Sequence, residues 1–80
     1  MSIKQETIIR VLRENGPMTA RQISDKLKEE GFTGTAELDP HKIGWTLRNL
    51  EKWYIVQQVG SVQGLRGVDV PVWAAKEVGQ

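Results

Sequence analysis

The side chains best suited to chemistry gather between residues 41 and 52. Three aliphatic residues in this run are spaced four and three apart, as on one side of a helix: Ile43, Leu47 and Leu50. If this side faces a core, a step of about 100° per residue turns the polar and aromatic residues outward. The outward set is His41, Trp45, Arg48 and Lys52, with Lys42, Thr46 and Asn49 on one flank and Gly44 on the other. The segment therefore predicts a solvent-facing surface rich in hydrogen-bond donors.

These residue types are suited to contacts with nucleic acid. The planar guanidinium of Arg48 can donate two hydrogen bonds to one guanine, and the amide of Asn49 can read adenine in the same way. Lys42 and Lys52 suit phosphates, for which a point charge is enough. The alternative is that these charges only keep one face of a helix in water, as exposed charges commonly do.

Trp45 stands out because nothing in the apolar spacing buries it. A large exposed aromatic side chain usually marks an interface. It could stack on a sugar or base, contact a thymine methyl group, or lie in a protein–protein contact. Alternatively, it folds sideways onto Phe32 or the later hairpin as part of the core edge. Gly44 costs about 1 kcal/mol in a helix relative to alanine, and either permits close approach of a partner or is simply tolerated.

The composition gives little support for a catalytic or metal-binding function. The chain has one histidine, no cysteine and no cluster of carboxylates, so it offers no nucleophilic triad, zinc-ligand set or acid–base pair. No glycine-rich phosphate loop follows a predicted strand. We therefore expect no enzyme activity, no cofactor and no bound metal.

Length and charge limit the remaining possibilities. Eighty residues support one domain, predicted over residues 1–75 with a short tail at 76–80. The absence of cysteine favours a reducing compartment, and no apolar run approaches the roughly 20 residues that span a bilayer. A cytoplasmic location without membrane contact is therefore expected.

The formal net charge is only +1, so a lone copy should bind DNA weakly and gain from dimerisation or a partner protein.

Two helices are predicted before the donor-rich segment. The first opens near Ile3, where Ser2 and Gln5 have the spacing of a capping box, and it ends at Gly16-Pro17. The second opens on the same box at Thr19 and Gln22 and closes at Gly31, which is expected in a left-handed conformation. Their inward residues are predicted to be Ile8, Ile9, Val11 and Leu12 in the first helix and Ala20, Ile23 and Leu27 in the second.

The third helix follows a loop from Phe32 to Leu38, in which Phe32 is expected to tuck under the core. It starts at Asp39-Pro40, because aspartate is a favoured N-cap and proline fits the first turn. Leu38 and Ile43 fall at the two positions of a hydrophobic staple. The helix is expected to end around Trp53-Tyr54.

A β-hairpin is predicted after the third helix. Ile55–Val59 is expected to form a strand, Gly60–Gly67 the connection, and Val68–Ala74 the returning strand. Pro71 restricts the returning strand to an edge, Trp73 should pin the sheet to the helices, and Met18 could add a short strand. In the connection, Arg66 could enter a minor groove or touch a phosphate; otherwise it is one charge on a flexible loop. Val62 and Leu65 either pack back on the body or form a second exposed patch.

This order of elements resembles the winged helix-turn-helix family of DNA-binding domains. The residues that carry the resemblance are Ile8-Ile9-x-x-Leu12, Gly16-Pro17-Met18-Thr19, Ile23-x-x-x-Leu27, Ile43-x-x-x-Leu47-x-x-Leu50, Ile55-Val56 and Val72-Trp73. Two features depart from the family pattern. The connection before the third helix is longer than the roughly three or four residues usual there, and Tyr54 stands where the family often has glycine.

The resemblance implies a small α+β domain that binds double-stranded DNA, with the third helix in the major groove and the hairpin wing on a neighbouring groove or the backbone. The expected contacts are Lys42, Trp45, Arg48, Asn49, Lys52 and Arg66. Such a chain would be a small transcriptional regulator or a phage- or plasmid-type accessory protein, and it could act as a homodimer. The first alternative is a winged helix that binds protein through Trp45 or the wing. The second is a structural subunit with Trp45 and Val62–Leu65 as a buried seam.

Overall fold

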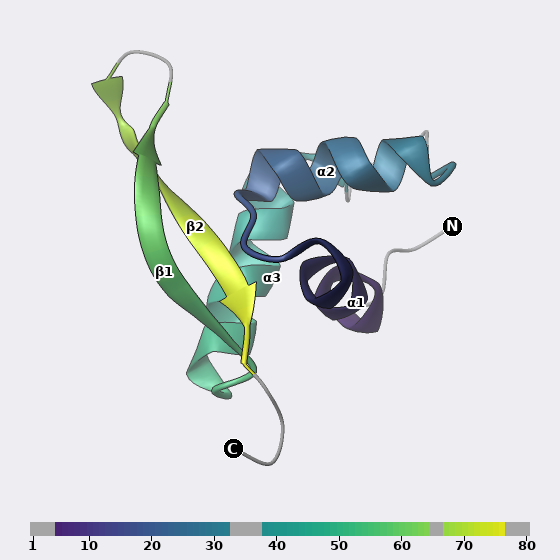
Figure 1. The fold of residues 1–80 in the computed structure, drawn as a ribbon, viewed down its shortest axis with the longest axis horizontal. Coiled ribbons are helices and arrows are strands. Elements are labelled where there is room, and N and C mark those ends of the chain that lie inside the picture. The colour runs from purple at the N-terminus through teal and green to yellow at the C-terminus, as the bar shows by residue number, and fades with distance from the viewer. Residues whose placement is uncertain (1–4, 33–37, 65–66, 77–80) are drawn as a thin grey trace.

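The computed structural model describes residues 5–32, 38–64 and 67–76. Three helices, α1 (Gln5–Asn15), α2 (Ala20–Glu29) and α3 (Pro40–Lys52), precede two strands, β1 (Val56–Gln63) and β2 (Asp69–Ala75). The strands form an antiparallel hairpin whose tip stands clear of the helices (Figure 1). This small α+β architecture is consistent with the predicted winged-helix layout. No helix in the described part of the chain is long and apolar enough to cross a membrane.

The helix boundaries follow from local capping, largely as predicted. The Thr19 hydroxyl accepts a hydrogen bond from the Gln22 backbone N–H, and the Gln22 side chain accepts one from the Thr19 N–H, so the capping box at α2 is confirmed. Gly31 has a φ of +101° and ends α2 as expected. Asp39 caps α3 with Pro40 in its first turn. The predicted capping box at Ser2 and start near Ile3 lie outside the described residues.

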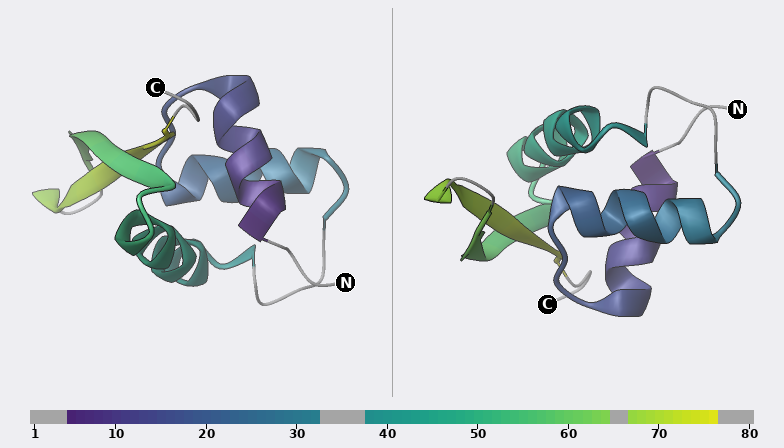
Figure 2. Two further views of the ribbon diagram at one scale, coloured as in Figure 1. Left: turned by 90° about the horizontal axis from the view of Figure 1, so that it is seen from below. Right: turned by 90° about the horizontal axis from the view of Figure 1, so that it is seen from above.

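The core lies where the three helices meet the base of the hairpin. The helices bury the apolar faces predicted from their spacing, and Ile9, Ala20 and Phe32 pack partly buried against the same cluster. In Figure 2, α1 crosses α2, and the hairpin projects from the helices on the side of α3. The buried cluster comprises Ile8, Val11, Leu12, Met18, Ile23, Leu27, Leu38, Ile43, Leu47, Leu50, Val56 and Trp73.

Met18 and Trp73 connect the hairpin to the helices. Their backbones exchange two hydrogen bonds, each with an N···O distance of 2.8 Å. The predicted pairing of Met18 with the sheet is confirmed, but as a bridge of one residue and not as a strand. Trp73 is 1% exposed, as expected for a residue that pins the sheet to the body. This bridge fixes the start of α2 against β2.

The hairpin connection is shorter than predicted. The sequence prediction placed it at Gly60–Gly67, but β1 continues through Gly60 to Gln63, opposite Val72 to Asp69. Glycine and serine in this stretch resemble turn residues, yet the partner strand supplies backbone hydrogen bonds that keep it extended. Register shifts between Gln58 and Gly60, so a β-bulge marks this part of the strand.

The end of α3 holds a tyrosine in a conformation that glycine usually adopts. The Ile55 N–H donates to the Leu50 carbonyl and the Tyr54 N–H to the Glu51 carbonyl, which together form a Schellman motif. Tyr54 lies at the left-handed position of this motif with a φ of +59°, where α2 has Gly31. At the end of α3, Tyr54 therefore takes the backbone conformation that Gly31 takes at the end of α2.

We expect Tyr54→Gly to be more stable than Tyr54→Ala by about 1 kcal/mol, because only the glycine avoids the steric cost of a left-handed residue. Both variants remove the tyrosine ring, which lies under the Lys76 ammonium at 5.0 Å, so this loss cancels in the comparison. Urea denaturation followed by circular dichroism measures the difference. If the two variants are equally stable, or if the alanine variant is more stable, the left-handed conformation at residue 54 does not cost stability.

Arg10 ties the C-terminal part of α1 to the end of α2. Its guanidinium donates to the Glu30 carboxylate at 2.6 Å and to the Glu14 carboxylate at 3.1 Å. The hydrogen bond from Arg10, helped by its positive charge, holds the pKa of Glu30 below its ordinary value of 4.5, although partial desolvation opposes the shift. The same bond raises the pKa of Arg10. This ion pair is the main electrostatic link between the two helices in the described residues.

The stabilisation from Glu30 is expected to be lost in acid. A carboxylate with a lowered pKa in the folded state contributes stability that is fully present above its ordinary pKa of 4.5 and disappears as pH falls through the folded value. Glu30→Gln should therefore be less stable than the wild type at neutral pH. This difference in stability should shrink as pH falls through the pKa of Glu30 in the folded state. Denaturation midpoints measured from neutral pH down to about pH 3 test this.

The control for this experiment is Glu29→Gln, which removes a carboxylate that faces Lys26 at 3.5 Å on the same helix. It reports the general effect of losing one negative surface charge. A gap between wild type and Glu30→Gln that stays constant with pH would show that the Arg10 pair contributes nothing to the pH dependence.

Candidate nucleic-acid interface

The exposed side of α3 carries the residues predicted to contact a partner. The Asp39 carboxylate accepts a hydrogen bond from the His41 N–H at 3.0 Å and fixes the start of the helix. Ile43, Leu47 and Leu50 are buried, so the opposite side of the helix faces solvent. The exposed side chains there include Lys42, Trp45, Arg48, Asn49 and Lys52. The predicted orientation of the helix is therefore confirmed.

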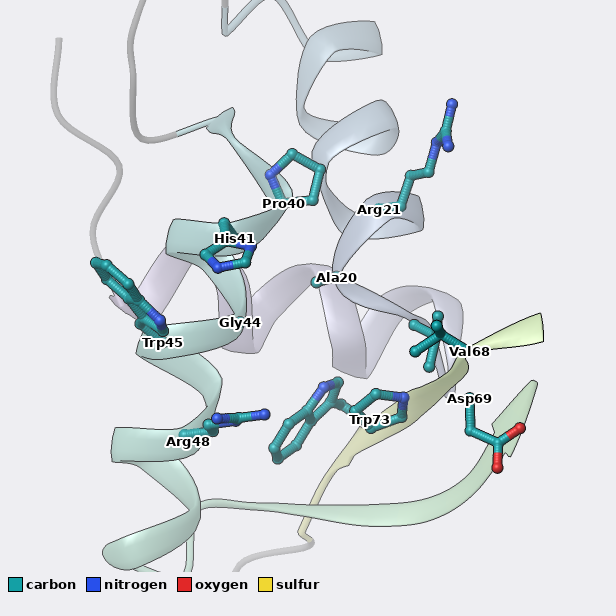
Figure 3. A pocket seen from close by; sticks show the side chains of 12 residues that line it. Ala20, Arg21, Pro40, His41, Gly44, Trp45, Arg48, Val68, Asp69 and Trp73 are labelled. Carbon is teal, nitrogen blue, oxygen red and sulfur yellow. The ribbon is translucent and has the colours of Figure 1, made fainter. Parts of the chain in front are cut away.

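A hollow of about 450 Å³ lies between α3, the start of α2 and the hairpin. Trp73 of β2 forms its floor, and small residues, Gly44 and Ala20, line its sides (Figure 3). A Cβ added at Gly44 would meet no atom within 4 Å, so packing within the domain leaves room for alanine there. The full lining is Ala20, Arg21, Pro40, His41, Gly44, Trp45, Arg48, Val68, Asp69, Val70, Pro71 and Trp73.

Arg48 lines this hollow from the side of α3. Its side chain extends from α3 toward Trp73 and the hairpin, whereas Arg21 and Asp69 lie at the rim with their charged ends directed away (Figure 3). No ion pair joins Arg48 to any of the described residues, in contrast to Arg10, which is held by two carboxylates. The guanidinium is thus placed beside an open space with its donors free for a ligand.

Trp45 separates this hollow from a second one on the side of α1. The second hollow, of about 480 Å³, is lined by Lys42 and Asn49 together with Gln5, Ile8, Ile43, Trp45 and Thr46. Trp45 itself is 59% exposed, so the alternative that it closes the edge of the core is wrong. Its indole meets the His41 ring edge to face, with 5.7 Å between the ring centroids.

The predicted site residues are therefore brought together only in part. Arg48 faces the hairpin, whereas Lys42 and Asn49 lie on the other side of Trp45. Lys52, in the last turn of α3, is exposed but lines neither hollow. Arg66 lies outside the described residues, and its predicted contact at the wing stays a prediction.

Arg21 is a site residue that the sequence pattern does not reveal. Helical spacing places it on the solvent-facing side of the second helix, but the Met18–Trp73 bridge brings the start of α2 beside the hairpin, so Arg21 borders the same hollow as Arg48. The predicted pairing of Met18 is the signal that could have found it, because any strand at Met18 brings the next helical turn to the sheet. Among the described residues that line this hollow are two arginines and one histidine, against a single carboxylate, Asp69.

In the described part of the chain, no group of three or more histidine, aspartate or glutamate side chains is placed to hold a metal ion. Comparisons of the chain with protein-family models, with curated proteins and with solved structures found no match.

Proposed function

We propose that this chain is a double-stranded DNA-binding module that serves as a small transcriptional regulator or a phage- or plasmid-type accessory protein. In this proposal α3 enters the major groove, and the hairpin lies along the backbone or an adjacent minor groove. Arg48 and Asn49 read bases, Lys42 and Lys52 contact phosphates, and Trp45 packs on sugar or base. Arg66 contributes from the hairpin connection.

One observation carries the proposal: Arg48, which has no ion pair among the described residues, extends from the exposed side of α3 toward the hairpin, and both line one hollow. A buried or ion-paired arginine in this place would argue for a structural role. Arg48 has neither constraint within the described residues, so its charge and its two-pronged donor geometry suit a guanine edge or a phosphate.

The dimensions of the exposed helix agree with this mode of binding. α3 has 13 residues and so a length of about 20 Å, and a major groove about 12 Å wide admits one helix. With α3 in the groove, the adjacent strand of DNA backbone would run through the hollow beside Arg48 and past Arg21 at its rim. The second hollow would place Lys42 near the opposite backbone.

Fluorescence anisotropy of a labelled mixed-sequence duplex, titrated at two salt concentrations, tests the proposal. Because the net charge is only +1, we expect weak binding, with Kd about 10⁻⁶ to 10⁻⁴ M, that weakens further as salt rises. A labelled single strand of the same length serves as the control and should bind less well. Absence of duplex binding even at low salt would exclude this function.

A second candidate function is protein binding. Three large aromatic residues are exposed on α3 and just after it, namely Trp45, Trp53 at 76% and Tyr54 at 77%. Tryptophan and tyrosine are enriched among the residues that dominate protein–protein interfaces. A partner captured by the wild type and lost with Trp45→Ala, in a chain that shows no affinity for duplex, would favour this function over the first.

A further inference from the structure

The outer edge of β1 has no neighbour among the described residues. The sheet contains two strands, and β1 pairs only with β2. The other edge of β2 is engaged at Met18 through the two backbone hydrogen bonds to Trp73. Among the described residues, the hairpin therefore presents one edge that Met18 occupies at Trp73 and one edge, along β1, with no strand beside it (Figure 1).

Apart from the bulge near Gly60, β1 lacks the features that normally protect such an edge. Monomeric proteins guard exposed edges with charged residues, proline or very short strands. The eight residues of β1, Val-Gln-Gln-Val-Gly-Ser-Val-Gln, contain no charge and no proline. β2, whose edge is already engaged, carries both Asp69 and Pro71. The bulge near Gly60 leaves Gly60–Gln63 as the regular part of the open edge.

An apolar strip crosses one face of the hairpin and reaches this edge. Val62 lies opposite Val70, and Gly60 lies opposite Val72, so the three valines share one face of the sheet. Val70 and Val72 are partly buried, while Val62 is 48% exposed at the end of the strip. A further strand added beside β1 would cover Val62 and continue the strip.

We propose that β1 pairs antiparallel with β1 of a second copy of the chain, which joins two hairpins into a four-stranded sheet. An uncharged strand that faces its own copy meets no like charge. With Val62 opposite its own counterpart at the two-fold axis, Ser61 lies opposite Gln63 of the second copy, and the hydroxyl and amide side chains can hydrogen-bond across the new strand pair. Met18 occupies the outer edge of β2 at Trp73 in each copy, and Asp69 and Pro71 stand on the rest of that edge. A charged residue and a proline disfavour a further strand there, so the pairing closes at the dimer and does not extend into a fibre.

The open edge of β1 lies outside the hollow beside Arg48. The hollow beside Arg48 is lined from the hairpin by Val68 to Pro71 and Trp73, and no β1 residue contributes to it. Edge pairing thus leaves the exposed side of α3 accessible. Loss of the dimer and loss of DNA binding can be observed separately.

Sedimentation velocity from low micromolar to millimolar protein concentrations tests the pairing. The wild type should populate a dimer that dissociates on dilution. Val62→Lys places like charges across the new strand pair and should weaken the dimer about tenfold. An equimolar mixture of Val62→Lys and Val62→Glu should recover the association, because only the mixed dimer brings opposite charges together.

The matched control is Val68→Lys, which adds the same charge to the hairpin at an exposed residue outside β1 and should leave the dimer unchanged. Hydrogen exchange on the wild type provides a measurement that needs no variant: amides within Gly60–Gln63 should exchange more slowly at concentrations where the dimer is populated. A wild type that stays monomeric at millimolar concentration overturns the proposal. So does a dimer that Val62→Lys leaves intact, with unchanged exchange in β1.

Discussion

Replacing Trp73 by alanine is expected to remove a large part of the stability of the domain. The indole is 1% exposed and lies in the cluster where β2 meets the helices. Truncation of a buried tryptophan to alanine costs about 3–5 kcal/mol. A chain of 80 residues has a total stability of about 4–12 kcal/mol at typical values per residue. The variant should therefore unfold at much lower urea concentration than the wild type, as measured by far-ultraviolet circular dichroism.

Trp53→Ala is the control for this effect. Trp53 follows α3 directly and is 76% exposed, so the same substitution removes a tryptophan that contributes little to the core. We expect its free energy of unfolding to lie within about 0.5 kcal/mol of the wild type. Similar losses from the two substitutions would show that the hairpin is not anchored to the helices through Trp73.

The predictability of the helices from the sequence has a local cause. Caps such as Thr19 with Gln22, and Asp39 before Pro40, act on backbone groups within one turn, so neighbouring residues determine them. The inward faces follow from helical spacing alone. For this reason the amino-acid pattern is sufficient to predict the orientation of α3, with Leu47 buried and Arg48 outward.

The hairpin is harder to predict because its extent depends on pairing between distant residues. Gly60 and Ser61 resemble turn residues, but their partners, Val72 and Pro71, keep them in the strand. A buried polar residue escapes prediction for a similar reason. Ser24 is 1% exposed, and its hydroxyl donates to the Leu38 carbonyl, fourteen residues away, so no local pattern shows its role.

The candidate site is predictable as a set of residue types but not as an arrangement. Spacing shows that Lys42, Arg48 and Asn49 face outward. Only the packed structure shows that Trp45 divides them between two hollows. The approach of Arg21 to the hairpin likewise depends on the long-range bridge between Met18 and Trp73. The division matters for the proposed function, since it assigns Arg48 and Lys42 to opposite sides of the inserted helix.

Arg48→Ala is expected to weaken binding to a preferred duplex about ten- to a hundredfold, provided that the chain binds DNA as proposed. A two-pronged arginine–guanine contact contributes about 1–3 kcal/mol of discrimination. Truncation at an exposed residue with no described ion pair should leave the fold intact. Anisotropy titrations with sequence variants of the duplex measure the effect. If Arg48 contacts a base, the difference in affinity between wild type and Arg48→Ala should disappear for duplexes in which that guanine is replaced. If Arg48 contacts a phosphate, the variant should lose affinity equally for all duplex sequences, and the slope of log K against log salt concentration should be smaller by about one.

Arg13→Ala distinguishes a specific contact from a change in net charge. Arg13 is exposed in the last turn of α1 and lines neither hollow beside α3, so its removal lowers the net charge by the same amount at a different place. We expect it to weaken duplex binding only slightly, by long-range electrostatics that salt screens. If Arg48→Ala and Arg13→Ala weaken binding equally, Arg48 contributes charge alone. If Arg48→Ala has no effect while the wild type still binds duplex, α3 does not enter the groove with this side, and the DNA must lie on another surface of the domain.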